Sequence, residues 1–100
     1  MDQARHVFLD GNGLLGSCPR WQAHDCFTIL ETGFGAGVNF LTTWSAWRDS
    51  HDTGSTRRTG RLHYVSIEKH PLSRDVLVAM LARQAALQPF AQSLIEQWPL

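Results

Sequence analysis

Three glycines spaced two residues apart, directly after a short apolar run, constrain the fold of this chain more than any other sequence feature. The apolar run, residues 26–30 (CFTIL), has the β-prone character of a buried strand in a parallel sheet. It passes through Glu31 and Thr32 into residues 33–37 (GFGAG). Because glycine lacks a Cβ, such a run permits a tight turn and a close approach of the backbone to other atoms. We therefore predict a strand, a glycine turn and a helix in this order.

The segments beyond the glycine turn continue the alternation of helix and strand. Residues 38–47 are predicted to form a helix. Its apolar face consists of Phe40, Leu41, Trp44 and Trp47. Residues 62–67 (LHYVSI) are predicted to form a second buried strand, which ends at Glu68. A second helix is expected after Ser73, a suitable N-cap residue, and a third helix from Pro89.

This order predicts the α/β class, with the β-α-β-α-α portion of a parallel, Rossmann-like sheet. Two strands are fewer than the roughly five or six of an average sheet. We therefore expect a truncated fold: residues 1–100 form the incomplete N-terminal part of a domain that continues past Leu100.

Three other segments are predicted to be irregular or extended. Residues 6–9 (HVFL) have the character of a short extended segment, and residues 10–13 (DGNG) that of a turn. Residues 16–25 are predicted to form a loop. Residues 48–60 contain many turn formers and show no apolar periodicity, which predicts a flexible loop. The helix after Ser73 should carry an apolar stripe made of Val76, Leu77, Met80 and Leu81.

Composition excludes several classes of function. Nine basic and nine acidic residues cancel, so no overall charge attracts nucleic acid. Residues 1–6 are polar and lack the apolar core of a signal peptide, and no apolar run approaches the roughly 20 residues of a membrane span. We therefore expect a cytoplasmic protein without membrane contact. Cys18, His24 and Cys26 match no common zinc spacing, so we expect no metal site. The sequence leaves the oligomeric state open.

The residues with the clearest chemical meaning are the glycine turn and two acids, Glu31 before it and Glu68 after the second strand. The N-terminus of the following helix offers free N–H groups and positive partial charge, which suit a carboxylate or phosphate. Parallel strands end at one edge of their sheet, so Glu68 should lie beside the glycine turn. A carboxylate in that place accepts hydrogen bonds from a ribose diol.

The spacing of these residues helps to choose the ligand. In the dinucleotide fingerprint G-x-G-x-x-G the third glycine comes one residue later than Gly37 does here, and the acid follows about 20 residues on, closer than Glu68. S-adenosylmethionine carries no phosphate, and its positive ammonium and sulfonium groups favour an acid such as Glu31. We therefore predict S-adenosylmethionine as the ligand, while a segment of an NAD- or FAD-binding oxidoreductase remains an alternative.

Several motifs together resemble one known family. They are residues 7–14 (VFLDGNGL), 31–41 (ETGFGAGVNFL), 62–74 (LHYVSIEKHPLSR) and 97–99 (QWP). They look like the methyltransferase domain of the tRNA 5-methylaminomethyl-2-thiouridine biosynthesis bifunctional protein family. The resemblance implies a class I methyltransferase that transfers a methyl group from S-adenosylmethionine to the aminomethyl nitrogen of a modified wobble uridine in tRNA. In fused members a separate C-terminal domain is an FAD-dependent oxidase, which is absent here.

The resemblance also assigns residues. The cofactor turn would comprise Glu31, Gly33, Phe34, Gly35 and Gly37, with Glu68 as the ribose-binding acid. Asn12 and Asn39 are further candidates, for contacts with the methionine end of the cofactor.

The chain also departs from the family pattern. It lacks the family's segment before His6 and its later strands, which include an acidic Asn-Pro segment that helps to form the amine pocket. We therefore expect little activity from this chain alone, and a non-enzymatic remnant is a second alternative. The catalytic base is not identified, because no histidine pairs with a nucleophile in a known motif. The histidines are His6, His24, His51, His63 and His70.

Overall fold

The computed structural model of the chain describes residues 4–15, 21, 26–53, 56–57 and 60–100. Its principal elements are β1 (Cys26–Thr32), α1 (Val38–His51), β4 (Arg61–Ile67), α2 (Arg74–Leu81) and α3 (Phe90–Gln97). Shorter elements are η1 (Ala4–Leu9), η2 (Asp10–Asn12), β2 (Asp52–Thr53), β3 (Thr56–Arg57) and η4 (Ala85–Leu87). The protein is therefore an α/β structure, as predicted.

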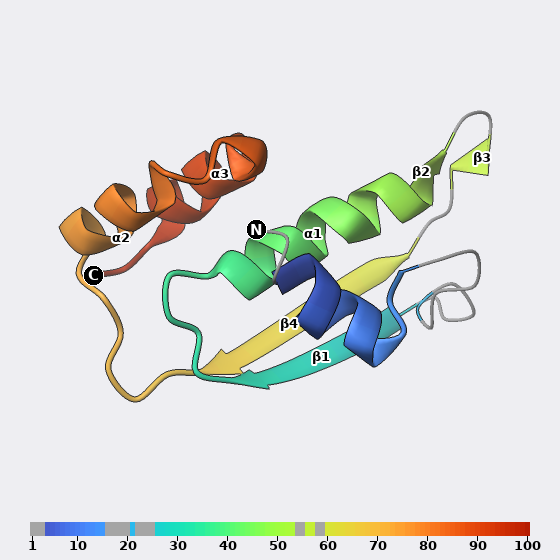
Figure 1. Cartoon of the computed structure of the whole chain (residues 1–100), viewed down its shortest axis with the longest axis horizontal. Helices are drawn as coiled ribbons and strands as arrows, with labels where there is room; N and C mark the ends of the chain where they lie inside the picture. The colour runs from blue at the N-terminus through green and yellow to red at the C-terminus, as the bar shows by residue number, and fades with distance from the viewer. Residues whose placement is uncertain (1–3, 16–20, 22–25, 54–55, 58–59) are drawn as a thin grey trace.

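The two long strands, β1 and β4, pair in parallel, in a register that runs from Cys26 opposite Arg61 to Thr32 opposite Ile67. A parallel pair requires a crossover, and α1 supplies it by returning along one face of the strands (Figure 1). Both strands point toward the same end of the sheet, where the glycine turn and the segment after β4 begin. The two predicted strands are confirmed, each slightly longer than expected.

The loop expected over residues 48–60 differs from the structure. Helix α1 continues through His51, and β2 pairs antiparallel with β3. Arg48 and Asp49 are exposed, so this last part of the helix has no apolar face to bury, and its periodicity is invisible in the sequence. Residues 54–55 and 58–59 lie outside the described part of the chain.

The extended segment expected at residues 6–9 is wrong, because these residues belong to the π-helix η1. Helical winding buries Leu9 completely, in a cluster with Leu14, Trp21 and Ala46 of α1. The predicted turn follows: after η2, Gly13 has a φ of 71° and its N–H donates to the Asp10 carbonyl over 3.0 Å. The loop expected over 16–25 lies outside the described residues except for Trp21.

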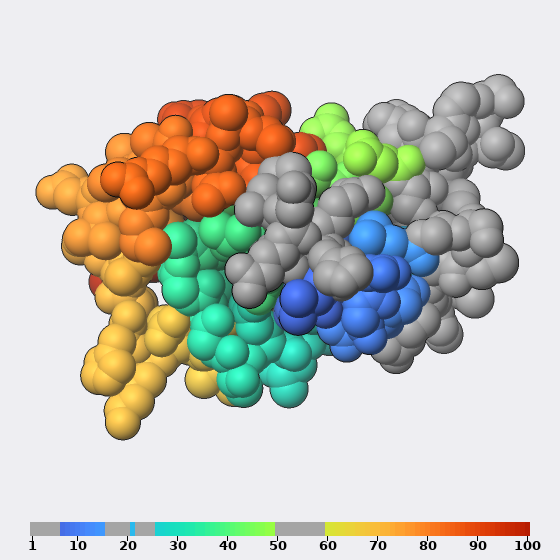
Figure 2. Space-filling model, in the orientation of Figure 1, coloured from blue at the N-terminus to red at the C-terminus, as the bar shows by residue number. Residues whose placement is uncertain are grey.

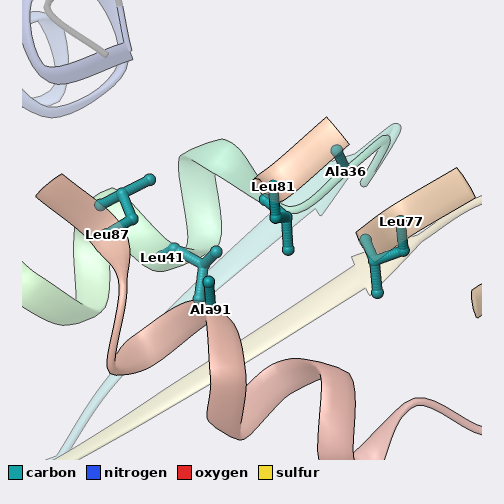
Figure 3. Packing of buried hydrophobic residues seen from close by; sticks show 6 residues of the cluster. All are labelled: Ala36, Leu41, Leu77, Leu81, Leu87 and Ala91. Atoms are coloured by element: carbon teal, nitrogen blue, oxygen red, sulfur yellow. The ribbon is translucent and has the colours of Figure 1, made fainter. Parts of the chain in front are cut away.

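A second cluster joins α1 to the two C-terminal helices. Its buried side chains are Ala36, Leu41, Leu77, Leu81, Leu87 and Ala91, which converge from all three helices and the segments beside them (Figure 3). The stripe predicted for α2 is narrower than expected, because Val76 and Met80 stay 45% and 48% exposed. The predicted N-cap is confirmed: the Ser73 hydroxyl accepts a hydrogen bond from the Val76 N–H.

One face of the sheet is covered and the other is open among the described residues. The face toward α1 carries Glu31 and other buried or half-buried side chains, whereas Leu30, Val65 and Ile67 on the opposite face are 67%, 50% and 62% exposed. The two strands, which were predicted to be buried, are therefore buried on one face only among the described residues. In the space-filling view, the glycine turn and the start of α1 (teal) lie between the surface of α2 and α3 (orange) and that of η1 and η2 (blue) (Figure 2).

Candidate functional site

The glycine turn connects the carboxyl end of β1 to the first turn of α1. Gly33, Gly35 and Gly37 have φ angles of 84°, 58° and 81°, a region that residues with side chains rarely adopt. The Gly33 N–H donates to the Ile67 carbonyl over 2.8 Å, which ties the start of the turn to the end of β4. The predicted turn is thus present, at the end of the sheet where both strands finish.

The three glycines are required for different reasons. A Cβ at Gly33 or Gly35 would meet no atom within 4 Å, so these two residues border open space. A Cβ at Gly37 would lie 2.8 Å from the Phe34 ring and 3.0 Å from the Leu94 side chain. The absence of a side chain at Gly37 therefore makes room for the ring of Phe34 and for a side chain of α3.

Glu68 lies beside the glycine turn, as predicted. Its Oε1 accepts a hydrogen bond from the Gly35 N–H over 2.8 Å, and its Oε2 accepts one from the His70 N–H over 3.1 Å. These two bonds hold the pKa of the Glu68 carboxyl below its ordinary value, and the bond from Gly35 has the larger effect. The carboxylate is therefore charged at neutral pH and held at the mouth of the turn.

Glu31 is buried, with 6% of its surface exposed, and joins three elements. Its Oε2 accepts a hydrogen bond from the Asn39 amide over 3.0 Å, and its Oε1 accepts one from the Ser66 hydroxyl over 2.9 Å. Asn39 belongs to the first turn of α1, and Ser66 lies opposite Glu31 on β4. Sequence reasoning missed Ser66, because only the strand register shows that it faces Glu31.

Tyr64 lies near the same carboxylate. Its buried hydroxyl stops short of hydrogen-bond geometry with any described residue. Burial first, and then the negative charge of Glu31, raise the pKa of the Tyr64 phenol well above its ordinary value. Tyr64 is therefore neutral at physiological pH and a poor candidate for a base.

The other candidates are placed less favourably for direct contact with a ligand. The Phe34 ring turns into the interior, where it stacks on Trp98 with ring centroids 5.7 Å apart. Asn12 lies on η2 beside a cavity of about 190 Å³ that no residue of the glycine turn lines. Phe34 thus contributes to the packing of the turn, and Asn12 lines a separate cavity.

A larger cavity lies at the opposite end of β4. It has a volume of about 590 Å³ and is lined chiefly by aromatic and apolar side chains of α1, β4 and α3, among them Trp44, Trp47 and Tyr64. Neither Glu68 nor any residue of the glycine turn lines it. We therefore do not assign this cavity to the candidate site.

Other chemistry has little support in the described part of the chain. His63 and His70 are exposed, and the side chains of His6, His24 and His51 lie outside what the structure describes. No three or more His, Cys, Asp or Glu side chains gather there as potential metal ligands, and Cys26 is an exposed free thiol. Among these residues, no helix combines the length and apolar character that a membrane crossing requires.

Three known proteins to which the chain is similar all have the same name. No family model matches the chain. It is 51% identical over 98 residues to the tRNA 5-methylaminomethyl-2-thiouridine biosynthesis bifunctional protein MnmC of Ralstonia nicotianae. Proteins of the same name from Cupriavidus necator and Aromatoleum aromaticum are 52% identical over 98 residues and 48% identical over 99 residues.

These matches include 98–99% of this chain but only 14% of each relative's length. They confirm the resemblance seen in the sequence: over nearly its whole length the chain is similar to one segment of the tRNA 5-methylaminomethyl-2-thiouridine biosynthesis bifunctional proteins.

Proposed function

We propose that this chain forms the S-adenosylmethionine-binding part of a tRNA methyltransferase that modifies the wobble uridine. The observation that carries the proposal is the hydrogen bond between the Glu68 carboxylate and the Gly35 N–H at the carboxyl ends of the two parallel strands. Ligands of open α/β sheets bind at that end, and a carboxylate there suits a ribose diol.

The residues present fit a nucleoside joined to an amino acid. Gly33 and Gly35 border open space, so a ligand can approach the backbone there without meeting a side chain. A carboxylate accepts up to about four hydrogen bonds, so Glu68 keeps acceptor capacity for two hydroxyl groups beside its two backbone donors. The buried charge of Glu31, fixed by Asn39 and Ser66, favours a cationic ligand group near the turn.

When bound, S-adenosylmethionine would supply an activated methyl group. The chain's own contribution is to bind and orient the cofactor through Glu68, the backbone of the glycine turn and the N-terminus of α1. The acceptor must be a neutral amine, and none of the described residues is placed as a base for it. The proposal therefore assigns the base to none of the described residues.

The names of the relatives supply the substrate class, since they state a role in 5-methylaminomethyl-2-thiouridine biosynthesis on tRNA. In this proposal the methyl acceptor is the aminomethyl nitrogen of the modified uridine, as the motif resemblance implies, and the protein acts in the cytoplasm. An FAD-dependent oxidase would be a separate part of fused members. The proposal extends to no activity of the 100 residues alone.

Calorimetric titration of the full-length protein with S-adenosylhomocysteine tests the assignment. Losing one charge-assisted hydrogen bond costs about 1.5–3 kcal/mol, so Glu68→Ala should weaken binding roughly 10- to 100-fold. Glu96→Gln, at an exposed acid on α3, is the control and should bind like wild type. Wild-type affinity in Glu68→Ala would remove Glu68 from the site. Binding of NADH in place of S-adenosylhomocysteine would favour an oxidoreductase.

A further inference from the structure

The residue that follows α3, Trp98, touches both halves of the candidate site. Its ring stacks on Phe34 of the glycine turn, with centroids 5.7 Å apart and ring planes 21° from parallel. Its Nε1–H donates a hydrogen bond to the Leu72 carbonyl over 2.9 Å. Its own carbonyl accepts a hydrogen bond from the Arg74 guanidinium. Trp98 therefore binds the glycine turn on one side and the segment after Glu68 on the other.

The segment after Glu68 has few other attachments. It projects from the body of the protein between β4 and α2 (Figure 1), and Lys69, His70 and Pro71 are all exposed. Near Glu68 it is held by that residue's own hydrogen bonds. Near α2 it is held by the hydrogen bond of the Leu72 carbonyl with Trp98 and by the packing of the Leu72 side chain against the core. Loss of the Trp98 contact would leave the segment held by the end of β4, by the two bonds of Glu68 and by the packing of Leu72 against the core.

Through its stack on Phe34, Trp98 contacts the glycine turn directly. The Phe34 ring lies over Gly37, so close that a Cβ there would be 2.8 Å away, and it also packs on Phe40 with centroids 5.9 Å apart. Phe34 stands between Gly33 and Gly35 in the chain, so the packing of its ring fixes the backbone on both sides. The Gly35 N–H that meets Glu68 follows directly from this anchored residue.

We propose that Trp98 is a positioning residue of the cofactor site, which sets the placement of Glu68 relative to the glycine turn and thereby the affinity for the nucleoside. The proposal rests on the proposed function for its ligand. The coupling of Trp98 to Glu68 and to the glycine turn, in contrast, exists in the protein without ligand. Trp98 touches no reacting atom and acts through Phe34 and Leu72.

The first test measures the coupling without any ligand. In the full-length protein, hydrogen exchange of the Gly35 amide reports how often its bond to Glu68 opens. Trp98→Leu should speed this exchange about tenfold, a typical size for coupling through packed side chains. The control is Phe90→Leu on α3, whose ring packs on Trp44 with centroids 4.8 Å apart, away from the turn. Equal exchange rates in the two variants would overturn the proposal.

The second test separates positioning from stability. At a temperature where thermal melts show every variant folded, Trp98→Leu should bind S-adenosylhomocysteine about tenfold more weakly than wild type. Phe90→Leu should lower the melting temperature but keep wild-type affinity. Trp98→Phe keeps the stack on Phe34, loses the donor to Leu72, and should bind with intermediate affinity. Wild-type affinity in Trp98→Leu would overturn the proposal.

The outcomes remain distinct from those of the proposed function. If the wild-type protein binds no S-adenosylhomocysteine, the proposed function fails, while the exchange of Gly35 still tests the coupling. If Trp98→Leu does not fold, the exchange of the Gly35 amide and the affinity for S-adenosylhomocysteine are both measured on Trp98→Phe. Wild-type values for Trp98→Phe in both would then overturn the proposal.

Discussion

At the scale of single residues, the site depends on a carboxylate that the backbone holds in place. Glu68 receives two N–H groups, from Gly35 and His70, and its pKa is lowered mainly by the first of them. A carboxyl group with a lowered pKa in the folded state contributes stability above its unfolded pKa. That contribution disappears as the pH falls through the folded pKa.

The bond between Glu68 and Gly35 should therefore persist at neutral pH and break on acidification. The amide shift of Gly35, followed by NMR, should titrate with a midpoint below 4.5, the ordinary pKa of a glutamate side chain. Glu68→Gln should abolish this titration, because its amide does not ionise in that range. A midpoint above 4.5 would show that the carboxylate is not stabilised by these donors.

The glycines should differ in their tolerance of substitution. Gly35→Ala places a side chain in a left-handed backbone conformation, which costs about 1–2 kcal/mol. Gly37→Ala has the same backbone cost and adds a clash with Phe34 and Leu94, for which overpacking costs about 1–3 kcal/mol more. Denaturant melts should rank Gly37→Ala as the less stable variant. Equal stabilities would mean that Phe34 moves aside freely.

At the scale of elements, the junction of β1, β4 and α1 depends on the buried carboxylate of Glu31. Its partners come from the other two elements, Asn39 on α1 and Ser66 on β4. A buried charge is tolerated when its oxygens are hydrogen-bonded, so each partner stabilises the crossover as well as the charge. The glycine turn begins at Gly33, two residues after Glu31 in the sequence.

Removing the Ser66 hydroxyl should destabilise the fold. Ser66→Ala leaves the Oε1 of Glu31 without its donor, and hydrogen bonds to charged groups contribute about 1.5–3 kcal/mol. Thr28→Ala, on the exposed side of β1, is the control and should cost less. Urea unfolding of the two variants measures the difference. A smaller loss for Ser66→Ala than for Thr28→Ala would show that Glu31 does not need this donor.

The elements that the sequence predicted are those whose signals are local. The apolar runs of β1 and β4, the glycines between β1 and α1, and the Ser73 cap each act within a few residues. The placement of Glu68 followed from one topological rule, that parallel strands end at one edge. Ser66 and Trp98 act through strand register and a contact between distant segments, which no local pattern encodes. The last turn of α1 was missed because its residues carry no apolar periodicity, and Arg48 and Asp49 are exposed.

At the scale of the whole molecule, one face of the sheet lacks cover among the described residues. Leu30, Val65 and Ile67 are all at least half exposed, and Leu30 lies opposite Val65 across the two strands. Contiguous apolar surface of this kind promotes association with other surfaces. The relatives are about seven times longer than this chain, since it matches 14% of their length.

The 100-residue chain produced alone should therefore associate through this face. Val65→Thr with Ile67→Thr keeps β-branched side chains in the strand while making the face polar. Light scattering and binding of an apolar dye should both decrease in this double variant. The control, Val76→Thr with Val78→Thr, changes exposed valines on α2 and should leave both signals near wild type. If the control variant reduced both signals as much as the sheet variant, association would not depend specifically on the exposed face of the sheet, and the exposed valines of α2 would contribute equally.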